Sequence, residues 1–538
     1  MLEKLAAEER VAELIELVVT LLVQMRDKNT ALAARLGSAL RELYGRKSEK
    51  ISTEQLMLLF TQLGDHVPPA AAAAAGLSPE TAPDQSGMVP QPAEPAKPLK
   101  PVRRARGGRG PLPSHLPREP RVVPVPEAER TCAQCGAEKE CIGHCVSEIL
   151  DFAPAQLRVI EERREKLVCK RCPEEGVETA PSEKVMVRGR PGPGLLANIV
   201  IEKIDDALPL YRQAERYARL GVPLSPSTLG DWSAFALDVL TPVAERIGNR
   251  IFGSSYVRAD DTGLRVLDHD HPNGIKRGHM WGFVGDRLVT FFYAPDWKAK
   301  HPAELLFDFT GHLQGDGYAG YAAMLRGDNT AELILPEDRR LGCGMHIRRN
   351  FEKLAKVGDA RAAVVLGYFK GIYRVEAACK DDGLSPEGRY ARRQEVSLPI
   401  VDDMYRWIHE MHSSAVPNTP LYKATHYAVN QEKAWRRCFT DGRFEIDNGE
   451  VERQIRRIAV GRKNYLFAGS DKGAARLAVG YTVFGSCRMH GVNSLEWATD
   501  VIGKLQSGWP RSQLDELVPD IWAKRRLEDA AATIAAPS

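Results

Sequence analysis

The residues that decide the fold lie near the middle of the chain, in three closely spaced segments: YVRAD at 256–260, GHMWGFV at 278–284 and LVTFFY at 288–293. These segments are rich in aromatic and β-branched residues and are separated by turn-forming sequence, which predicts three strands. The sequence that follows predicts a short helix, a strand, a helix and a further strand, at residues 303–306, 313–316, 318–325 and 341–345.

This order of elements is that of a ribonuclease-H-like fold. The sequence therefore predicts a multidomain α+β protein with a ribonuclease-H-like α/β catalytic core, whose first part spans residues 251–350. Residues 351–446 read as mostly helical, and residues 447–505 read as the second part of the core. The helical stretch is thus expected to be an insertion within the core, and residues 506–538 are expected to form a C-terminal tail.

Three acids in this core are candidate catalytic residues. Asp260 is expected at the end of the first strand, Asp316 at the end of the fourth, and Glu452 on the helix after the insertion. The first and fourth strands are neighbours in a ribonuclease-H-like sheet, so Asp260 and Asp316 can share one side of it. Mg²⁺ prefers oxygen ligands, and paired Mg²⁺ ions serve phosphoryl transfer. We therefore expect the three acids to hold two Mg²⁺ or Mn²⁺ ions per active site.

Basic residues surround the third acid. They can contact DNA phosphates, although a solvated or ion-paired helix face is the alternative; the residues are Arg453, Arg456, Arg462 and Lys463. His346 is a candidate for active-site support, since it could polarise the scissile phosphate, or it could be a buried structural histidine.

The N-terminal part of the chain predicts a helix and a linker. Apolar residues at 3–4 spacing in residues 1–65 predict a coiled-coil-like oligomerisation segment, or a helix that packs on its own protein. Residues 66–120 are proline-rich and basic, which predicts an extended linker. The arginines of this linker can contact DNA phosphates, or they can simply keep the linker solvated. They are Arg103, Arg104 and Arg106.

Two C-x2-C pairs in residues 121–183 predict a structural zinc site, because each pair can present two thiolates to one tetrahedral ion. The expected ligands are Cys132, Cys135, Cys169 and Cys172. Three nearby side chains compete with them, namely Cys141, His144 and Cys145. Alternating residues at 147–152 and 157–160 predict hairpin strands that bring the two pairs together. We expect one zinc ion per chain.

Residues 184–250 read as helical and resemble a helix-turn-helix. A helix at 211–220 is followed by a turn at 221–225 and by a second helix from Pro226, with Ser225 as the N-cap. The segment could read DNA or serve as a plain helical brace.

The composition sets limits on the whole chain. Its 538 residues carry 74 Lys and Arg against 71 Asp and Glu, a net charge of +3, which excludes a uniformly charged polyanion-binding protein but not local basic patches. Ten cysteines are too few for a disulfide-rich protein. No apolar stretch reaches the ~18–20 residues of a membrane span. A soluble cytosolic protein without a membrane partner is expected.

Taken together, these segments resemble transposases of the insertion-sequence 66 family, within the DDE superfamily. The resemblance follows the family's order through nearly the whole chain: LYGRKSEK (43–50), LPSHLPR (112–118), the double C-x2-C block with VSEIL (146–150), ADDT (259–262), LQGDGYAGY (313–321), CGMHIRRNF (343–351), and IDN (446–448) through GRKNYLF (461–467). It implies that Asp260, Asp316 and Glu452 are the catalytic triad.

The chain departs from the family pattern at two places. Asp261 stands where the family has Glu, and Gly449 stands where it has a second Asn, followed by Glu450. Asp261 and Glu450 are therefore rival ligands. Successive side chains on a strand face opposite ways, and residues two apart on a helix differ by roughly 200°. Only one acid of each pair can face the metals, and the family register favours Asp260 and Glu452.

The resemblance implies a DNA transposase that uses two metal ions to cut the ends of an insertion element and transfer the strands into target DNA. Its first partner would be double-stranded DNA, both the element's terminal inverted repeats and the target DNA. Its protein partners would be a second copy of the chain and accessory proteins encoded in the same element. The chain would act in the cytoplasm, on the nucleoid. The alternatives are a non-catalytic zinc-containing DNA-binding protein and a nuclease of the same fold that does not join strands.

Overall fold

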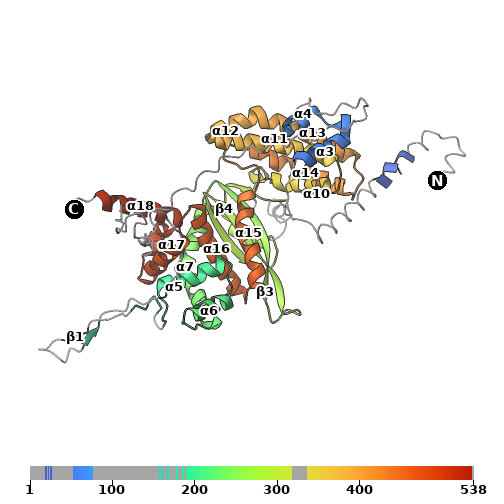
Figure 1. The fold of residues 1–538 in the computed structure, drawn as a ribbon. Helices are drawn as coiled ribbons and strands as arrows, with labels where there is room; N and C mark the ends of the chain where they lie inside the picture. The colour runs from blue at the N-terminus through green and yellow to red at the C-terminus, as the bar shows by residue number, and fades with distance from the viewer. Residues whose placement is uncertain are drawn as a thin grey trace, which may run out of the picture. The chain divides into compact units, whose positions relative to one another are not determined.

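The computed structural model describes residues 53–76, 189–317 and 336–535, together with a few residues between 18 and 26 and between 157 and 186. These residues form a mostly helical α+β protein with one five-stranded sheet and a separate two-stranded ladder. Figure 1 shows the helices gathered around the sheet and in a second, purely helical group. None of the helices that the structure describes combines the length and apolarity that a membrane span requires.

The five-stranded sheet is mixed, with the strand order β5-β4-β3-β6-β7. The first three strands pair antiparallel in chain order, and β6 and β7 then pair parallel beside β3. The bounds are β3 (Tyr256–Leu267), β4 (Ile275–Gly285), β5 (Leu288–Ala294), β6 (His312–Gln314) and β7 (Arg340–Leu341), with α8 (Lys300–Leu305) between β5 and β6. The predicted helix at 318–325 lies outside the described residues.

Three predicted strand ends are wrong. Asp316 does not end the fourth strand, because β6 pairs with β7 only at Leu313 and Gln314 and ends at Gln314. Asp260 does not end its strand, because β3 continues to Leu267 and pairs with β4 along its length, which places Asp260 fifth in a strand of 12 residues. The strand predicted at 341–345 ends at Leu341, because the chain turns at Cys343 into helix α10 (Gly344–Ala355).

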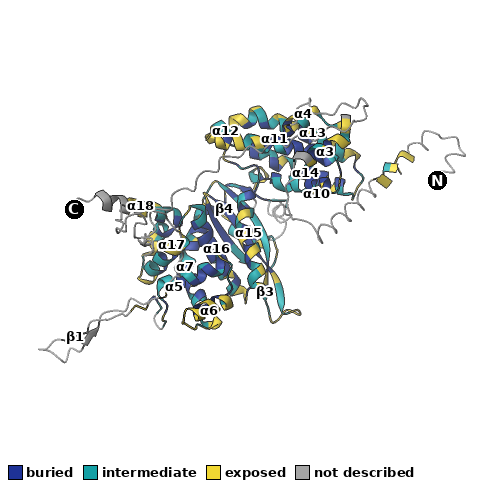
Figure 2. Cartoon of the chain, viewed as in Figure 1, coloured by how far each residue is buried: buried dark blue, intermediate teal, exposed yellow. Residues whose placement is uncertain are grey.

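The sheet's outer strand is covered by helix α16 (Asp471–Met489). Thr482 accepts a hydrogen bond from the Phe291 N–H at 2.8 Å, and Ser486 bonds both the N–H and the carbonyl of Val289. These hydroxyls satisfy the backbone groups that an edge strand leaves unpaired. Figure 2 shows that α16 and the strands beside it are largely buried.

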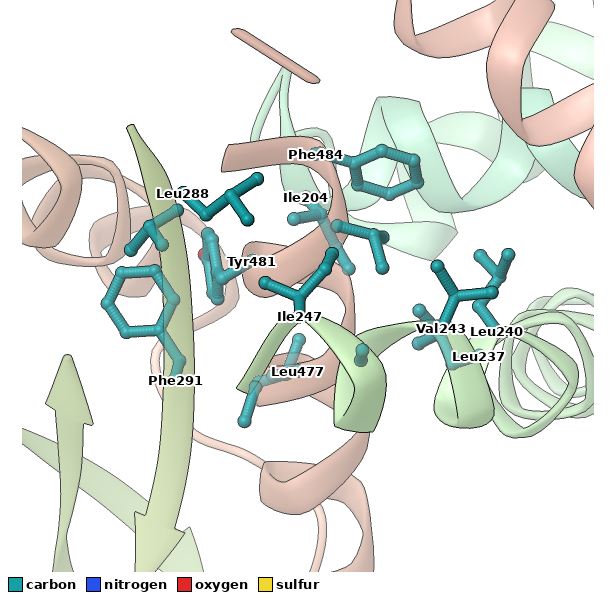
Figure 3. Close-up of a cluster of buried hydrophobic side chains, with 14 of the residues drawn as sticks. Ile204, Leu237, Leu240, Val243, Ile247, Leu288, Phe291, Leu477, Tyr481 and Phe484 are labelled. Carbon is teal, nitrogen blue, oxygen red and sulfur yellow. The ribbon is translucent and has the colours of Figure 1, made fainter. Parts of the chain in front are cut away.

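Helix α7 (Pro226–Phe252) builds the core against α16 and α5 (Pro193–Ile204). Its apolar side chains pack with Leu477, Tyr481 and Phe484 of α16 and with Ile204 of α5, as Figure 3 shows. The predicted N-cap is present, since Ser225 accepts a hydrogen bond from the Thr228 N–H at 3.1 Å. Helix α6 (Leu210–Arg219) and the turn before α7 match the expected helix-turn-helix elements. One face of α7 is buried, from Leu229 to Ile251, so this face packs into the core.

The insertion forms a second hydrophobic core, with helices α11 (Arg361–Asp381), α12 (Pro386–Arg392), α13 (Leu398–Ser414) and α14 (Pro420–Arg436). Arg393 lies within it and is fully buried. Its guanidinium pairs with Glu376 at 2.7 Å and donates to the carbonyls of Cys438, Asp441 and Phe444. One buried cation thereby ties α11 to the loop that leads back to the catalytic core.

Part of the segment expected to be an extended linker is folded. Helix α4 (Pro69–Ala75) and helix α3 (Thr53–Leu63) pack on α11, and Ala71 and Ala75 are fully buried there. A Cβ added at Gly371 of α11 would lie 2.9 Å from the Ala74 Cβ, so small residues on both helices allow this close approach. The rest of the N-terminal helix expected at 1–65 and of the linker lies almost entirely outside the described residues.

The unit formed by residues 84–180 is described only in pieces. Strand β1 (Lys166–Val168) pairs antiparallel with β2 (Val177–Thr179), with Lys166 opposite Thr179. The strand predicted at 157–160 is wrong, since Leu157, Val159 and Ile160 are in no strand and are exposed. The four predicted zinc ligands lie outside the described residues.

Candidate active site

The three candidate acids come from three elements that meet at one face of the sheet. Asp260 lies within β3, Asp316 follows β6 by two residues, and Glu452 lies in the first turn of α15 (Gly449–Tyr465). Figure 1 shows α15 running alongside β3 and β4. Because β6 pairs with β3 at residues 256–258, the chain leaves β6 close to Asp260.

The negative charges of Asp316 and Glu452 both raise the pKa of Asp260. Burial and the negative charge of Asp316 raise the pKa of Asp260 from 3.8 to about 8, and the charge of Glu452 adds to this. A hydrogen bond that Asp260 Oδ1 accepts from the Asp261 N–H at 2.9 Å opposes the rise. Like charges that repel one another at a partly buried site mark a place where a cation can bind.

Helix α15 is fixed to β3 at its first residues. Asn448 Nδ2 donates to the carbonyl of Ala259 at 2.6 Å, beside Asp260. Asp447 accepts hydrogen bonds from the Gly449 N–H at 2.8 Å and from the Tyr373 hydroxyl at 2.9 Å. A Cβ at Gly449 would lie 2.8 Å from the Asp447 carboxylate, so the glycine suits this tight start of the helix.

Two side chains of α10 contact Glu452. Arg349 Nη2 lies 3.0 Å from Glu452 Oε2, and His346 Nε2 lies 3.7 Å from Glu452 Oε1. His346 is therefore at the site, as expected. The role of Arg349 was missed, and the only sequence signal for it is its place in the CGMHIRRNF segment.

The two rival acids have other partners. Asp261 faces away from Asp260 along β3 and accepts hydrogen bonds from His279 Nδ1 at 2.6 Å and from Trp297 Nε1 at 3.1 Å. Glu450 pairs with Arg453 and accepts a hydrogen bond from Gln454 at 3.1 Å. These contacts favour Asp260 and Glu452 as the members of the triad.

The predicted DNA-contacting residues take different positions. Arg456 and Lys463 are exposed, and Arg453 is exposed but paired with Glu450. Arg462 turns back to β3, where it donates to Thr262 Oγ1 at 2.9 Å and to the carbonyl of Gly263. Arg103, Arg104 and Arg106 lie outside the described residues.

Comparison with known proteins identifies the group to which the chain belongs. A family model described as Transposase IS66 family matches residues 188–476, which include all three acids. The chain belongs to the IS66 family of transposases. Further models of this family match residues 129–173, as the zinc-finger binding domain of transposase IS66, and residues 482–519, as the IS66 C-terminal element. A model described as Transposase C of IS166 homeodomain matches residues 31–121.

Relatives of this IS66 family transposase occur in Sinorhizobium fredii. The uncharacterized protein y4hP is 30% identical over 94% of this chain and 91% of its own length. The uncharacterized proteins y4jD and y4qI are 31% and 33% identical over 78% and 76% of this chain, and over 83% and 76% of their own lengths. No solved structure matches the chain significantly.

The transposase is thus a DNA-binding, zinc-binding protein by family. The zinc-finger match includes all four predicted cysteines. Within the part of the chain that the structure describes, no three His, Cys, Asp or Glu side chains are grouped closely enough to hold a metal ion.

Proposed function

We propose that this IS66 family transposase cuts DNA at the ends of its element and joins the released 3′ hydroxyls to target DNA. The proposal is carried by the match of the transposase family model over residues 188–476 together with the placement of Asp260, Asp316 and Glu452 on three elements that converge, so that the acidic charges of Asp316 and Glu452 help to raise the pKa of Asp260. Three acids that belong to separate elements are poor candidates for a purely structural role, because their mutual repulsion opposes folding.

The strand order supports a ribonuclease-H-like core. Three antiparallel strands are followed by two that run parallel beside the first, and the helical insertion enters between β7 and α15. In such a sheet β3 and β6 are neighbours, which is the arrangement that the catalytic role of Asp260 and Asp316 requires. The proposal therefore rests on the fold as well as on the family.

The donor set fits a hard divalent cation. Carboxylate oxygens are the ligands that Mg²⁺ prefers, and a bound cation would offset the acidic charges that raise the pKa of Asp260. Asp260, Asp316 and Glu452 would hold Mg²⁺ or Mn²⁺. When bound, two such ions activate the attacking oxygen and stabilise the leaving one in phosphoryl transfer.

The chain's own side chains have supporting tasks. Arg349 holds the Glu452 carboxylate at 3.0 Å, and Asn448 ties the start of α15 to β3, so both position the third acid. Arg456 and Lys463 are exposed on α15 and would contact DNA phosphates. Because the acids hold metals rather than attack the phosphate, no covalent protein–DNA intermediate forms.

The test uses a duplex that carries the element's terminal repeat. Asp260→Asn, Asp316→Asn and Glu452→Gln should each abolish Mg²⁺-dependent cleavage and leave binding of the duplex largely intact. Glu450→Gln, two residues away on the same helix, is the matched control and should cleave like the wild type. Cleavage at the wild-type rate by one of the triad variants would show that this residue's assignment is wrong.

A strand-transfer assay separates the alternatives. With a pre-cut end, the wild type should produce joined DNA. Cleavage without joining would indicate a nuclease of the same fold, and binding without cleavage would indicate a non-catalytic DNA-binding protein. A working transposase would act on the nucleoid in the cytoplasm, as an oligomer, and with accessory proteins of the same element.

A further inference from the structure

A pocket opens beside the active site, on the side of β3 to which Asp261 points. Its volume is about 550 Å³, within the range of about 300–1,000 Å³ that is typical of ligand sites. We call it the Trp297 pocket. Its lining residues are Asp261, Thr262, Gly263, Arg277, His279, Asp296, Trp297 and Arg462.

Trp297 presents a fixed aromatic surface in this pocket. About 52% of the residue is exposed to solvent. Its indole N–H donates to Asp261 at 3.1 Å, and its ring stacks on His279 with the planes 12° apart. A large aromatic side chain that is half exposed but held by two partners offers a rigid surface on which a planar ligand can stack.

Both aspartates that line the pocket are bonded to basic side chains, whereas Arg462 is bonded to neutral oxygens. Asp261 pairs with His279 at 2.6 Å, and Asp296 pairs with His301 at 2.7 Å and with Lys298 at 3.0 Å. Arg462 donates to two neutral oxygens, the hydroxyl of Thr262 and the carbonyl of Gly263. Arg277 and Arg462 are therefore the lining side chains that can receive an anionic group.

A second observation points to an anionic ligand. Arg277 is exposed and lies directly opposite Arg265 on the β3–β4 ribbon. Like charges at opposite positions of two paired strands repel one another. Neither arginine forms an ion pair with a carboxylate among the described residues. A phosphate that bound in the pocket against Arg277 would relieve this repulsion.

The end of α15 adds an exposed apolar rim. Residues 465–467 form a strained γ-turn centred on Leu466, which has φ 64° and ψ −45°. The Phe467 N–H closes the turn by donating to the carbonyl of Tyr465 at 2.7 Å. Leu466 is 58% exposed and Phe467 38%. This γ-turn begins three residues after Arg462. Immediately after it, the Ala468 N–H donates to the carbonyl of Arg265 in β3. Apolar side chains in such a place can separate stacked bases.

We propose that the Trp297 pocket binds one unpaired nucleotide of the DNA strand that the transposase processes. The base stacks on Trp297, and the phosphate lies against Arg277 and Arg462. The proposal rests on the proposed function for the identity of the substrate. Base-to-aromatic stacking accepts any base, so the pocket would select an unpaired strand rather than a sequence.

The experiment measures binding rather than cleavage, so its result is separate from that of the activity test. The full-length protein with its zinc is titrated, without added Mg²⁺, into two fluorescent 20-bp duplexes, one blunt and one with three unpaired thymidines at a 5′ end. The wild type should bind the second duplex about tenfold more tightly. Trp297→Ala should remove this preference and leave blunt-duplex binding unchanged, while Trp297→Phe should retain most of it.

Two further variants control for folding and position. Arg277→Gln changes an exposed side chain and should reduce the preference severalfold without affecting folding. Tyr390→Ala removes an aromatic of 42% exposure from the insertion and should leave the preference unchanged. The proposal is overturned if the wild type shows no preference or if Trp297→Ala retains it.

Discussion

Asp260→Asn should stabilise the metal-free protein in a way that depends on pH. The pKa of Asp260 is raised from 3.8 to about 8 by burial and by its acidic neighbours. The native state therefore disfavours the ionised carboxylate, and asparagine has nearly the same shape without the charge. The substitution should raise the free energy of unfolding at every pH at which this carboxyl is ionised in the unfolded wild type.

The magnitude follows from the size of the shift. Each tenfold change in an acid dissociation constant corresponds to about 1.4 kcal/mol, so the rise of the pKa from 3.8 to about 8 corresponds to on the order of 5 kcal/mol. Since the folded pKa lies above the unfolded one, the stability that protonation contributes is present in full below about pH 4 and is lost as the pH rises to about 8. The variant should match the wild type at pH 4 and exceed it by a few kcal/mol at pH 8.

The assay is urea unfolding, followed by tryptophan fluorescence, at pH 4 to 8 without divalent metal. Added Mg²⁺ should stabilise the wild type at pH 8 and stabilise Asp260→Asn much less, because the metal would bind fewer carboxylates. Asp270→Asn, in the exposed loop between β3 and β4, is the control and should not change the pH dependence. A stability difference that is the same at pH 4 and pH 8 would refute the reasoning.

Two further predictions concern other parts of the chain. Arg393→Lys should lower the free energy of unfolding of the insertion by about 3 kcal/mol, because lysine cannot replace the guanidinium between Glu376 and three carbonyls. Urea unfolding measures this loss. The control is Arg392→Lys, which changes an exposed side chain and should leave the stability unchanged. The purified protein should contain about one zinc ion per chain, and Cys169→Ser should lose it while Cys379→Ser retains it; metal analysis that finds no zinc in the wild type would contradict the four-cysteine site.

Local sequence patterns predicted the strands of the core well and their ends poorly. The aromatic and β-branched runs in β3, β4 and β5 were sufficient to find these strands, because such residues are favoured where a strand buries one face or both. The extension of β3 beyond Asp260 was not predicted, because Asp261, Thr262 and Gly263 interrupt the apolar run, and pairing with β4 carries the strand on to the buried Leu264 and Val266. Likewise, the alanine-rich segment 69–75 is a helix because it packs on α11, a contact that no local pattern encodes.

The Trp297 pocket had no sequence signal. His279 and Trp297 lie 18 and 36 residues from Asp261, on β4 and in the loop after β5. Their side chains meet only because the ribbon of β3, β4 and β5 brings them together. The role of Arg349 was missed for the same reason, since its partner Glu452 is 103 residues away.

The sequence by itself determined the family, the order of the segments, and the short list of acids and cysteines that can serve chemistry. It could do so because motifs and strand patterns are local, and their order along the chain is read directly. Only the tertiary structure decided which acids act on one another. The charges of Asp316 and Glu452 help to raise the pKa of Asp260, while Asp261 bonds His279 and Glu450 pairs with Arg453, because side-chain direction is set by strand pairing and by the way α15 is fixed to β3.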